Sequence, residues 1–291
     1  MLIDPSPADP RATGIYTVET LLGFRSRFLR NARDVRIALP RPAEIRKVKR
    51  DSRQSQPLLL LNDGQDLEAL GILETLTTLV AAGKIGAPMV VAIPANGDRM
   101  MEYGISGEPD SRGRGARAAL YARFVLDEVM PVVTERALGE IRAADTAILG
   151  ASLGGLSAFD LAWRNPHVFG ICGVFSGSFW WRTDSSSMSA RQASRIAHRL
   201  IRRTRPAHTA RAALRFWFQT GTEDETDDRD GNGVIDAIQD TTELIGELRA
   251  KGWQPGDDAI YREVIGGRHE PSTWAGVFAE FARFAFASRA A

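Results

Sequence analysis

The stretch that decides the fold is residues 146–155, which read Thr-Ala-Ile-Leu-Gly-Ala-Ser-Leu-Gly-Gly. A short apolar run enters the pattern G-x-S-x-G around Ser152, and a helical pattern follows at 153–164. A serine hydroxyl is a poor nucleophile unless it is exposed beside a base, and a tight strand-to-helix turn provides that exposure. The glycines at positions 150 and 154 suit a turn in which strand and helix approach closely. We therefore predict a nucleophilic serine, with a packed turn of no catalytic role as the alternative.

Apolar runs alternate with helical patterns on both sides of this motif. The runs are Pro57–Asn62, Pro88–Pro94, Thr146–Gly150, Ile171–Ser176, Leu214–Thr220 and Ala259–Ile265. The helical patterns cover residues 67–82, 115–137, 153–164, 189–203, 240–251 and 272–287. Within the second pattern, Pro131 is expected to begin or kink a turn. Runs that are apolar throughout are typical of strands buried on both faces, as in a parallel sheet covered by helices.

Two β-leaning stretches, Tyr16–Phe28 and Asp34–Leu39, precede these runs and are close enough in sequence to pair antiparallel. The sequence therefore predicts a doubly wound α/β fold, in which a mostly parallel central sheet carries helices on both faces and antiparallel N-terminal strands. No repeat or composition break marks a second domain. We expect a loose segment at 1–13, a single domain over 14–291, and within it a solvated loop at Arg41–Gln56.

Composition and charge narrow the class of protein. The 291 residues are 44% hydrophobic, and 37 basic residues against 36 acidic ones give a formal net charge of +1. Such a balance leaves no global field that favours nucleic acid as a partner. The acidic, proline-rich N-terminus is unlike a signal peptide, and the apolar runs fall short of the ~18 residues that span a bilayer. We expect a cytoplasmic protein with no membrane partner.

Histidine and cysteine are scarce, which limits the chemistry. The single cysteine, Cys172, excludes an intrachain disulfide and a cysteine-rich zinc site. The four histidines are His167, His198, His208 and His269. His198 lies in an amphipathic helical pattern, and His167 and His208 lie in surface-type turns. His269 follows the run Ala259–Ile265 and precedes the last helical pattern, where a base is expected if the chain order is Ser, acid, His.

The acid is expected after the run Leu214–Thr220, where residues 221–225 read Gly-Thr-Glu-Asp-Glu. A carboxylate at this strand end can reach a histidine one loop away, hold the imidazole in the correct tautomer and stabilise the imidazolium. Asp224 is our prediction, with Glu223 and Asp227 as alternatives. A solvent-facing acidic turn is the other interpretation of this segment.

Taken together, these residues resemble the esterase group of α/β-hydrolases that includes enterochelin esterases, feruloyl and acetyl xylan esterases and mycolyltransferases. The matching segments, in order, are 60–66, 99–103, 121–131, 150–155, 165–170, 176–181, 221–224, and His269 with Trp274. The segment Ser-Gly-Ser-Phe-Trp-Trp at 176–181 is most similar to the enterochelin esterase branch. The resemblance implies the α/β-hydrolase fold, Asp224 as the acid, and the backbone N–H groups of Gln65 and Leu153 as the oxyanion hole.

The expected reaction is hydrolysis of a carboxylic ester through an acyl-enzyme, without an organic cofactor. Ser152 attacks, His269 moves the proton, and Asp224 orients His269. The substrate is expected to be a small siderophore-type or carbohydrate-linked ester. Three side chains are expected to line the pocket: Arg99, Trp180 and Trp181. For the tryptophans, a structural role under a loop is the alternative. The rival functions are acyl transfer on the same fold and a non-catalytic binding module on a hydrolase scaffold.

A cation loop is predicted directly after the acid. Residues 228–236 read Asp-Arg-Asp-Gly-Asn-Gly-Val-Ile-Asp, like the first nine positions of an EF-hand loop, with Gly233 at the sharp turn. Gln239 stands where the twelfth ligand, a glutamate, is expected. We predict a structural Ca²⁺ that stiffens the loop carrying the acid, and a metal-free turn is the alternative. The predicted ligands are Asp228, Asp230, Asn232, Val234, Asp236 and Asp240.

Overall fold

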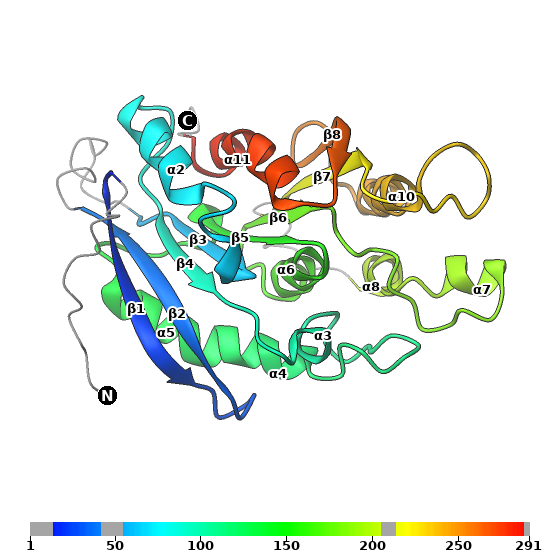
Figure 1. Cartoon of the computed structure of the whole chain (residues 1–291), viewed down its shortest axis with the longest axis horizontal. Coiled ribbons are helices and arrows are strands. Elements are labelled where there is room, and N and C mark those ends of the chain that lie inside the picture. The colour runs from blue at the N-terminus through cyan, green and yellow to red at the C-terminus, as the bar shows by residue number, and fades with distance from the viewer. Residues whose placement is uncertain (1–13, 42–54, 205–213, 288–291) are drawn as a thin grey trace.

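A computed structural model describes residues 14–41, 55–204 and 214–287 (Figure 1). The predicted loose segment 1–13, most of the predicted loop at 41–56, and His208 lie outside the described residues. The single-domain prediction therefore stays a prediction. One sheet nevertheless takes strands from the whole length of the described chain, because its first strand begins at Tyr16 and its last ends at Arg268.

The centre of the molecule is an eight-stranded sheet in the order β1-β2-β4-β3-β5-β6-β7-β8. The strands are β1 (Tyr16–Arg25), β2 (Ala32–Pro40), β3 (Leu58–Asn62), β4 (Met89–Ile93), β5 (Thr146–Ala151), β6 (Ile171–Phe175), β7 (Arg215–Glu223) and β8 (Ala259–Arg268). β1 pairs antiparallel with β2, and β2 with β4, whereas all pairs from β4–β3 to β7–β8 are parallel. The predicted sheet of antiparallel N-terminal strands followed by parallel ones is confirmed, and with it the α/β-hydrolase fold.

The inner strands are buried on both faces, as their apolar sequences predict. Every residue of β3, β4 and β6 is buried. β8 at the edge of the sheet is largely exposed, and it is longer than the predicted Ala259–Ile265. A register shift near Gly221 lets Arg268 pair with Glu223, and Gly266 takes the positive φ of 69° that this path requires. β8 thus continues to the residue before His269.

Helices cover both faces of the sheet (Figure 1). The longer ones are α2 (Ile72–Ala81), α6 (Leu153–Arg164), α8 (Ile196–Arg203), α10 (Asp236–Ala250) and α11 (Pro271–Phe286). α2 and α11 lie together on one face and enclose one apolar core with the sheet. The remaining long helices enclose a second core on the opposite face with α4 (Ala118–Arg123) and α5 (Met130–Arg136).

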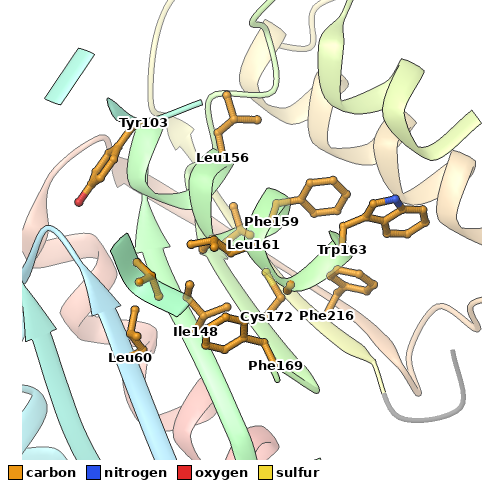
Figure 2. Packing of buried hydrophobic residues seen from close by; sticks show 14 of the residues in the cluster. Leu60, Tyr103, Ile148, Leu156, Phe159, Leu161, Trp163, Phe169, Cys172 and Phe216 are labelled. Atoms are coloured by element: carbon orange, nitrogen blue, oxygen red, sulfur yellow. The ribbon is translucent and has the colours of Figure 1, made fainter. Parts of the chain in front are cut away.

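The second core is rich in aromatic rings. Figure 2 shows Phe159 and Trp163 of α6 beside Phe216 of β7, and the ring centroids of Phe159 and Phe216 are 5.6 Å apart. Burying a phenylalanine side chain of this kind stabilises the fold by roughly 1.5–3 kcal/mol. Because α6 begins directly after Ser152, this packing anchors the turn that carries the serine.

One predicted helix is interrupted at Pro131, as the sequence predicts, and another is divided where the sequence pattern does not predict it. The predicted helix 115–137 is α4, a π-helical turn η2 (Phe124–Val129) and α5, because Pro131 stands in the first turn of α5 and has no N–H for the preceding ladder. The predicted helix 189–203 is divided into α7 (Met188–Ala193) and α8. Short elements complete the fold: η1 (Gly64–Asp66), α3 (Arg99–Glu102) and η3 (Ala143–Asp145). In the part of the chain that the structure describes, no helix is both long and apolar enough to cross a membrane.

Candidate active site

The predicted catalytic and oxyanion residues gather at one edge of the sheet. Each follows a parallel strand: Gln65 stands three residues after β3, and Ser152, Asp224 and His269 come directly after β5, β7 and β8. The carboxyl ends of parallel strands lie at the same edge, which is where open α/β sheets bind their ligands. The fold therefore brings together residues that are up to two hundred positions apart in the chain.

Ser152 sits in a strained turn between β5 and α6. Its backbone angles are φ 56° and ψ −124°, a combination that non-glycine residues rarely adopt, and its N–H donates to the carbonyl of Phe175 at 2.8 Å. A Cβ atom at Gly150 would overlap the carbonyl group of Gly154. A Cβ atom at Gly154 would in turn overlap the carboxylate of Asp63. The G-x-S-x-G pattern is therefore required by close backbone approach, as the sequence predicts.

The two predicted oxyanion residues follow neighbouring strands. Leu153 is the first residue of α6, so its N–H has no partner inside the helix. Gln65 lies in η1, where its side-chain oxygen accepts from the N–H of Ala95 at 2.9 Å and its side-chain nitrogen donates to Asp63 at 3.3 Å. These bonds fix the turn that carries the Gln65 N–H. Its role in an oxyanion hole stays a prediction.

Asp224 and His269 act on each other electrostatically. Burial lowers the pKa of His269, the charge of Asp224 raises it and the charge of Arg99 lowers it, so the pKa lies below its ordinary value. Burial raises the pKa of Asp224, while hydrogen bonds from the Gly221 N–H and the Ser176 hydroxyl, and the nearby His269, lower it. A His269 that is neutral near neutral pH is suited to accept a proton.

The Asp224 carboxylate has one committed oxygen and one without a partner. Oδ2 accepts the N–H of Gly221 at 3.0 Å. Oδ1 is buried and has no hydrogen-bond partner among the described residues. A buried carboxylate oxygen without a donor is costly, so this atom calls for an N–H donor. The alternative acid Glu223 instead pairs with Arg268 at 3.0 Å on the surface, and Asp227 is exposed.

The other described histidines do not share this setting. His198 on α8 is fully buried, and its Nε2 lies 3.0 Å from the carbonyl of Asp240. Burial holds its pKa well below the ordinary value. His167 is exposed in the turn after α6. Among the described histidines, His269 is therefore the one beside the predicted acid.

An ion pair that the sequence reasoning missed lies beside the serine turn. Arg99 in α3 binds Asp63 with two parallel bonds, Nε to Oδ1 and Nη2 to Oδ2, each 2.7 Å long. Asp63 is 5% exposed, and its N–H donates to the Tyr103 hydroxyl at 3.0 Å. Arg99 is predicted to line the pocket, and in the structure two of its nitrogen atoms bind Asp63. The two partners are 36 positions apart, so only the fold reveals the pair.

The two predicted pocket tryptophans differ sharply in exposure. Trp181 is 1% exposed, and its ring fills the space that side chains at Gly104 and Gly115 would need. This burial agrees with the structural alternative, and a contact of Trp181 with substrate stays a prediction. Trp180 is 37% exposed, and the Arg114 guanidinium lies 5.3 Å from its ring. Trp180 stays a predicted substrate contact.

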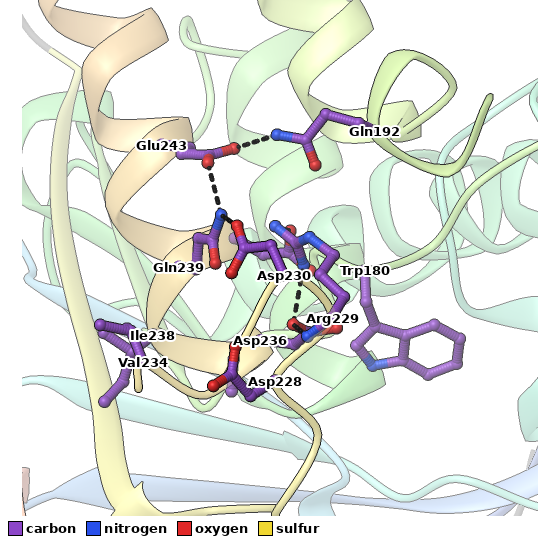
Figure 3. Close-up of polar contacts among 12 residues, drawn as sticks. Trp180, Gln192, Asp228, Arg229, Asp230, Val234, Asp236, Ile238, Gln239 and Glu243 are labelled. Carbon is purple, nitrogen blue, oxygen red and sulfur yellow. Dashed lines mark hydrogen bonds and ion pairs between the residues drawn. The ribbon is translucent and has the colours of Figure 1, made fainter. Parts of the chain in front are cut away.

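The predicted cation loop is ordered by its own hydrogen bonds (Figure 3). The Asp228 carboxylate accepts the N–H groups of Asn232 at 3.1 Å and Gly233 at 2.8 Å. The Asp230 carboxylate accepts the side-chain amide of Gln239 at 3.0 Å. Gly233 has a φ of 83°, which supplies the sharp turn. The side chains of Asp228, Asp230 and Asn232 are free of ion pairs with described residues.

The last two predicted ligands are bound by arginines. Asp236 and Asp240 stand in the first turns of α10, which begins four residues earlier than predicted, and both pair with Arg229 at 3.3 and 2.8 Å. Asp240 is 1% exposed and also pairs with Arg195 at 2.5 Å. Asp240 is thus already paired with two arginines, and its predicted role as a ligand stays a prediction. No three His, Cys, Asp or Glu residues in the described segments are placed to hold a metal ion. Binding of Ca²⁺ through the rest of the loop stays a prediction.

The family follows from a comparison with known proteins. A family model described as "Putative esterase" matches residues 26–284, which is most of the chain. The chain belongs to this esterase family. No curated protein matches this chain in sequence. The family match includes the strand ends at which all the predicted catalytic residues lie.

Solved structures share the fold of the esterase. The enterobactin esterase from Shigella flexneri has a TM-score of 0.65 and 20% identity over 93% of this chain and 59% of its own. A ferulic acid esterase has a TM-score of 0.65 and 17% identity, covering 93% of this chain and 96% of its own. The siderophore hydrolase EstB from Aspergillus nidulans has a TM-score of 0.63 and 20% identity, covering 96% and 97%. This chain thus spans about three fifths of the length of the Shigella enzyme.

Proposed function

We propose that this esterase hydrolyses a carboxylic ester through an acyl-enzyme formed on Ser152. The observation that carries the proposal is the buried Oδ1 of Asp224, which has no hydrogen-bond partner among the described residues, next to a histidine whose pKa it raises. An imidazole N–H is the donor that would satisfy this oxygen. A histidine held in that way presents its other nitrogen as a base.

The proposed steps use side chains that follow three strands. The Ser152 hydroxyl attacks the ester carbonyl carbon, and its proton passes to His269. The tetrahedral oxyanion accepts the N–H groups of Leu153 and Gln65. The bond to the alcohol then breaks, and His269 gives its proton to the leaving oxygen. A water molecule attacks the acyl-enzyme by the reverse route, which releases the carboxylic acid and restores the Ser152 hydroxyl.

We propose a small siderophore-type or carbohydrate-linked ester as the substrate. The support comes from the solved relatives that are enterobactin, siderophore and ferulic acid esterases. The half-exposed ring of Trp180, held by Arg114, is suited to pack against an apolar or aromatic part of such a molecule. A panel of catecholate siderophores, feruloyl sugars and acetyl sugars, assayed with and without a sugar acceptor, distinguishes these substrates and separates hydrolysis from acyl transfer.

The proposed mechanism is tested by Ser152→Ala. We expect this variant to keep the fold and to lose turnover of a chromogenic p-nitrophenyl ester by a factor of roughly a thousand or more, because the nucleophile is gone. A fluorophosphonate probe should label the parent protein at Ser152 and leave the variant unlabelled. Ser194→Ala serves as the control, because it changes a buried serine that lies between α7 and α8. Equal turnover by parent and Ser152→Ala would show that the mechanism is wrong.

A further inference from the structure

Asn62 is a buried polar residue that links two strand ends beside Ser152. It is the last residue of β3, it is 1% exposed, and its side-chain nitrogen donates to the carbonyl of Gly154 at 2.9 Å. Gly154 is the second residue of α6 and follows Leu153 directly. The Asn62 amide therefore connects the strand that leads to Gln65 with the turn that carries Ser152 and Leu153.

The side chain makes this connection where the backbone pairing between β3 and β5 has ended. β3 pairs with β5 from Leu58 to Leu61, whereas its pairing with β4 continues to Asn62. The end of β3 is thus paired with β4 on one side, and the Asn62 amide bonds the first turn of α6 on the other. The other four residues of β3 are leucines, and a buried amide among them is costly unless it is hydrogen-bonded.

The orientation of the Asn62 amide is fixed by its two neighbours. A carbonyl oxygen can only accept, so the Asn62 side-chain nitrogen must face Gly154. The Asn62 side-chain oxygen accepts the hydroxyl of Tyr121 at 2.7 Å. Tyr121 on α4 is 1% exposed and packs edge to face on Tyr103, with ring centroids 5.0 Å apart. The Tyr121 hydroxyl is therefore held by packed aromatic rings, and it holds the amide in turn.

The two residues after Asn62 pack just as closely against their surroundings. Asp63 has a φ of 54°, and its carboxylate fills the space that a Cβ atom at Gly154 would need. A Cβ atom at Gly64 would overlap the backbone of Ala92 near the end of β4. The turn that leads to Gln65 is thus packed between α6 on one side and β4 on the other.

We propose that Asn62 is a positioning residue that fixes the N–H groups of Leu153 and Gln65 relative to each other, and that the Tyr121 hydroxyl holds the Asn62 amide in place. The proposal rests on the proposed reaction at Ser152, in which these two N–H groups bind the oxyanion. Such donors are effective when both lie about 2.7–3.1 Å from the position of the developing oxyanion. Because the two N–H groups follow different strands, a bond between those strand ends keeps them in that geometry.

The test removes the amide and, separately, the hydroxyl that holds it. In Asn62→Ala the two strand ends lose their side-chain bond. We expect kcat on a chromogenic ester to fall about tenfold with KM nearly unchanged, because the oxyanion forms only after the substrate has bound. Tyr121→Phe removes one oxygen atom and should lower kcat by a smaller factor. The double variant should lose less than the product of the two factors, since both act through one amide.

Gln56→Ala is the matched control. Gln56 is 2% exposed, and its side-chain nitrogen donates to the carbonyl of Ala87 at 3.0 Å, so it is also a buried amide that binds a backbone carbonyl. It lies before β3, at the other end of the strand from Asn62. Gln56→Ala should lower Tm much as Asn62→Ala does, and kcat should stay at the parent value. An equal loss of kcat in both variants would assign the effect to stability and overturn the positioning role.

The decisive readout is the binding of an aliphatic trifluoromethyl ketone, which reports on the oxyanion hole without turnover. In the adduct, Ser152 Oγ bonds to the ketone carbon, the hydroxyl proton passes to His269, and the ketone oxygen becomes an oxyanion. We expect Ki to rise in Asn62→Ala and Tyr121→Phe by about the factor by which kcat/KM falls. In Gln56→Ala, Ki should stay at the parent value.

The outcomes separate this proposal from the proposed function. If Asn62→Ala and Tyr121→Phe keep kcat and Ki at the parent values while Ser152→Ala abolishes turnover, the positioning role is wrong. Tyr121→Phe alone decides this if Asn62→Ala does not fold. If the parent hydrolyses no ester but binds the ketone, and Asn62→Ala weakens that binding, the positioning role holds and the proposed hydrolysis is wrong. If the parent neither binds the ketone nor hydrolyses an ester, both proposals are wrong.

Discussion

At the scale of single residues, the candidate site combines a strained backbone at Ser152 with a carboxylate oxygen of Asp224 that lacks a hydrogen-bond donor. Ser152 is held at φ 56° by the bond from its N–H to Phe175 and by α6, which begins at the next residue. Asp224 Oδ1 is buried without a donor among the described residues. Strain and unsatisfied polar atoms both cost stability, and they persist where the surrounding structure fixes them. Ser152 and Asp224 follow β5 and β7, which flank β6, so both features occur at the same edge of the sheet, where the proposed reaction would take place.

Asp224→Asn tests the residue-scale account. An amide cannot supply the negative charge, so the imidazole loses the tautomer and the support that the carboxylate provides, and we expect kcat to fall roughly a thousandfold or more. The parent should lose activity as the pH falls through the pKa of His269, which lies below the ordinary value of about 6.5. Since the Asp224 charge raises that pKa, the variant's acidic limb should move to still lower pH. A pH profile of kcat/KM that keeps its limb in place would contradict this assignment, and Glu223→Gln, at the exposed alternative, is the control.

At the scale of elements, the loop between β7 and α10 concentrates charge of both signs. Asp236 and Asp240 on α10 are bound by Arg229, and Arg195 joins Asp240 from the start of α8. Burial raises the pKa of Glu225 to about 7. The neighbouring carboxylates also raise this pKa, and the hydrogen bond from the Ala237 N–H lowers it. Removing one partner of a buried ion pair typically lowers the free energy of unfolding by about 3–5 kcal/mol. This network therefore stabilises the packing of α8, α10 and the loop.

The predicted Ca²⁺ is tested on the same loop. We expect Ca²⁺ to raise Tm and a chelator to reverse the gain, because a ligand that binds only the folded state stabilises it. The exposed carboxylates of Asp228 and Asp230 and the side chain of Asn232 remain free of arginine partners in the described structure, so they are the ligands expected to respond. Asp228→Asn should abolish the effect of Ca²⁺, and Mg²⁺ is the control ion. If neither Tm nor activity changes on chelation, the loop is a metal-free turn.

The sequence predicted those elements whose signal is local, and it missed those that depend on long-range contacts. The serine turn was predictable because Gly150, Ser152 and Gly154 carry the whole requirement within five residues. His269 was found because three other histidines lay in less suitable patterns. The Arg99–Asp63 pair and the burial of Trp181 could not be predicted, because each depends on a segment that only the fold places beside it. The ion pair between Asp240 and Arg195 could not be predicted for the same reason, since the two residues are 45 positions apart.

At the scale of the whole molecule, the candidate site takes residues from elements that pack in both cores. α6, which follows Ser152, packs in one core, and α11, which follows His269, packs in the core on the other face of the sheet. Ser152 and His269 are therefore held by side chains packed on opposite faces of the sheet. On the proposed mechanism, loss of packing in either core should change the distance between them, so we expect a loss of stability to lower activity as well.

Cys172 reports on the integrity of the whole sheet. It stands in β6, paired with Ile148 of β5 and Phe216 of β7, is 0% exposed, and burial raises its pKa. We expect it to be inert to a thiol reagent in native buffer and to react fully in denaturant, because the thiolate forms only when the sheet opens. A variant carrying Cys172→Ala and Val18→Cys, with its thiol at a 40% exposed position, should react at once. Rapid labelling of native Cys172 would show that the centre of the sheet opens locally.

The order of the strands also has a consequence for synthesis. A nascent chain leaves the ribosome from its N-terminus and folds as it emerges. The serine turn needs β5, α6 and the carbonyl of Phe175 in β6, but the proposed acid and base, Asp224 and His269, arrive only with β7 and β8. Until the last strand has docked at the edge of the sheet, the growing polypeptide lacks the proposed proton acceptor of Ser152. On the proposed mechanism, an unfinished chain is therefore expected to be unable to attack esters, and this ability would be acquired late in translation.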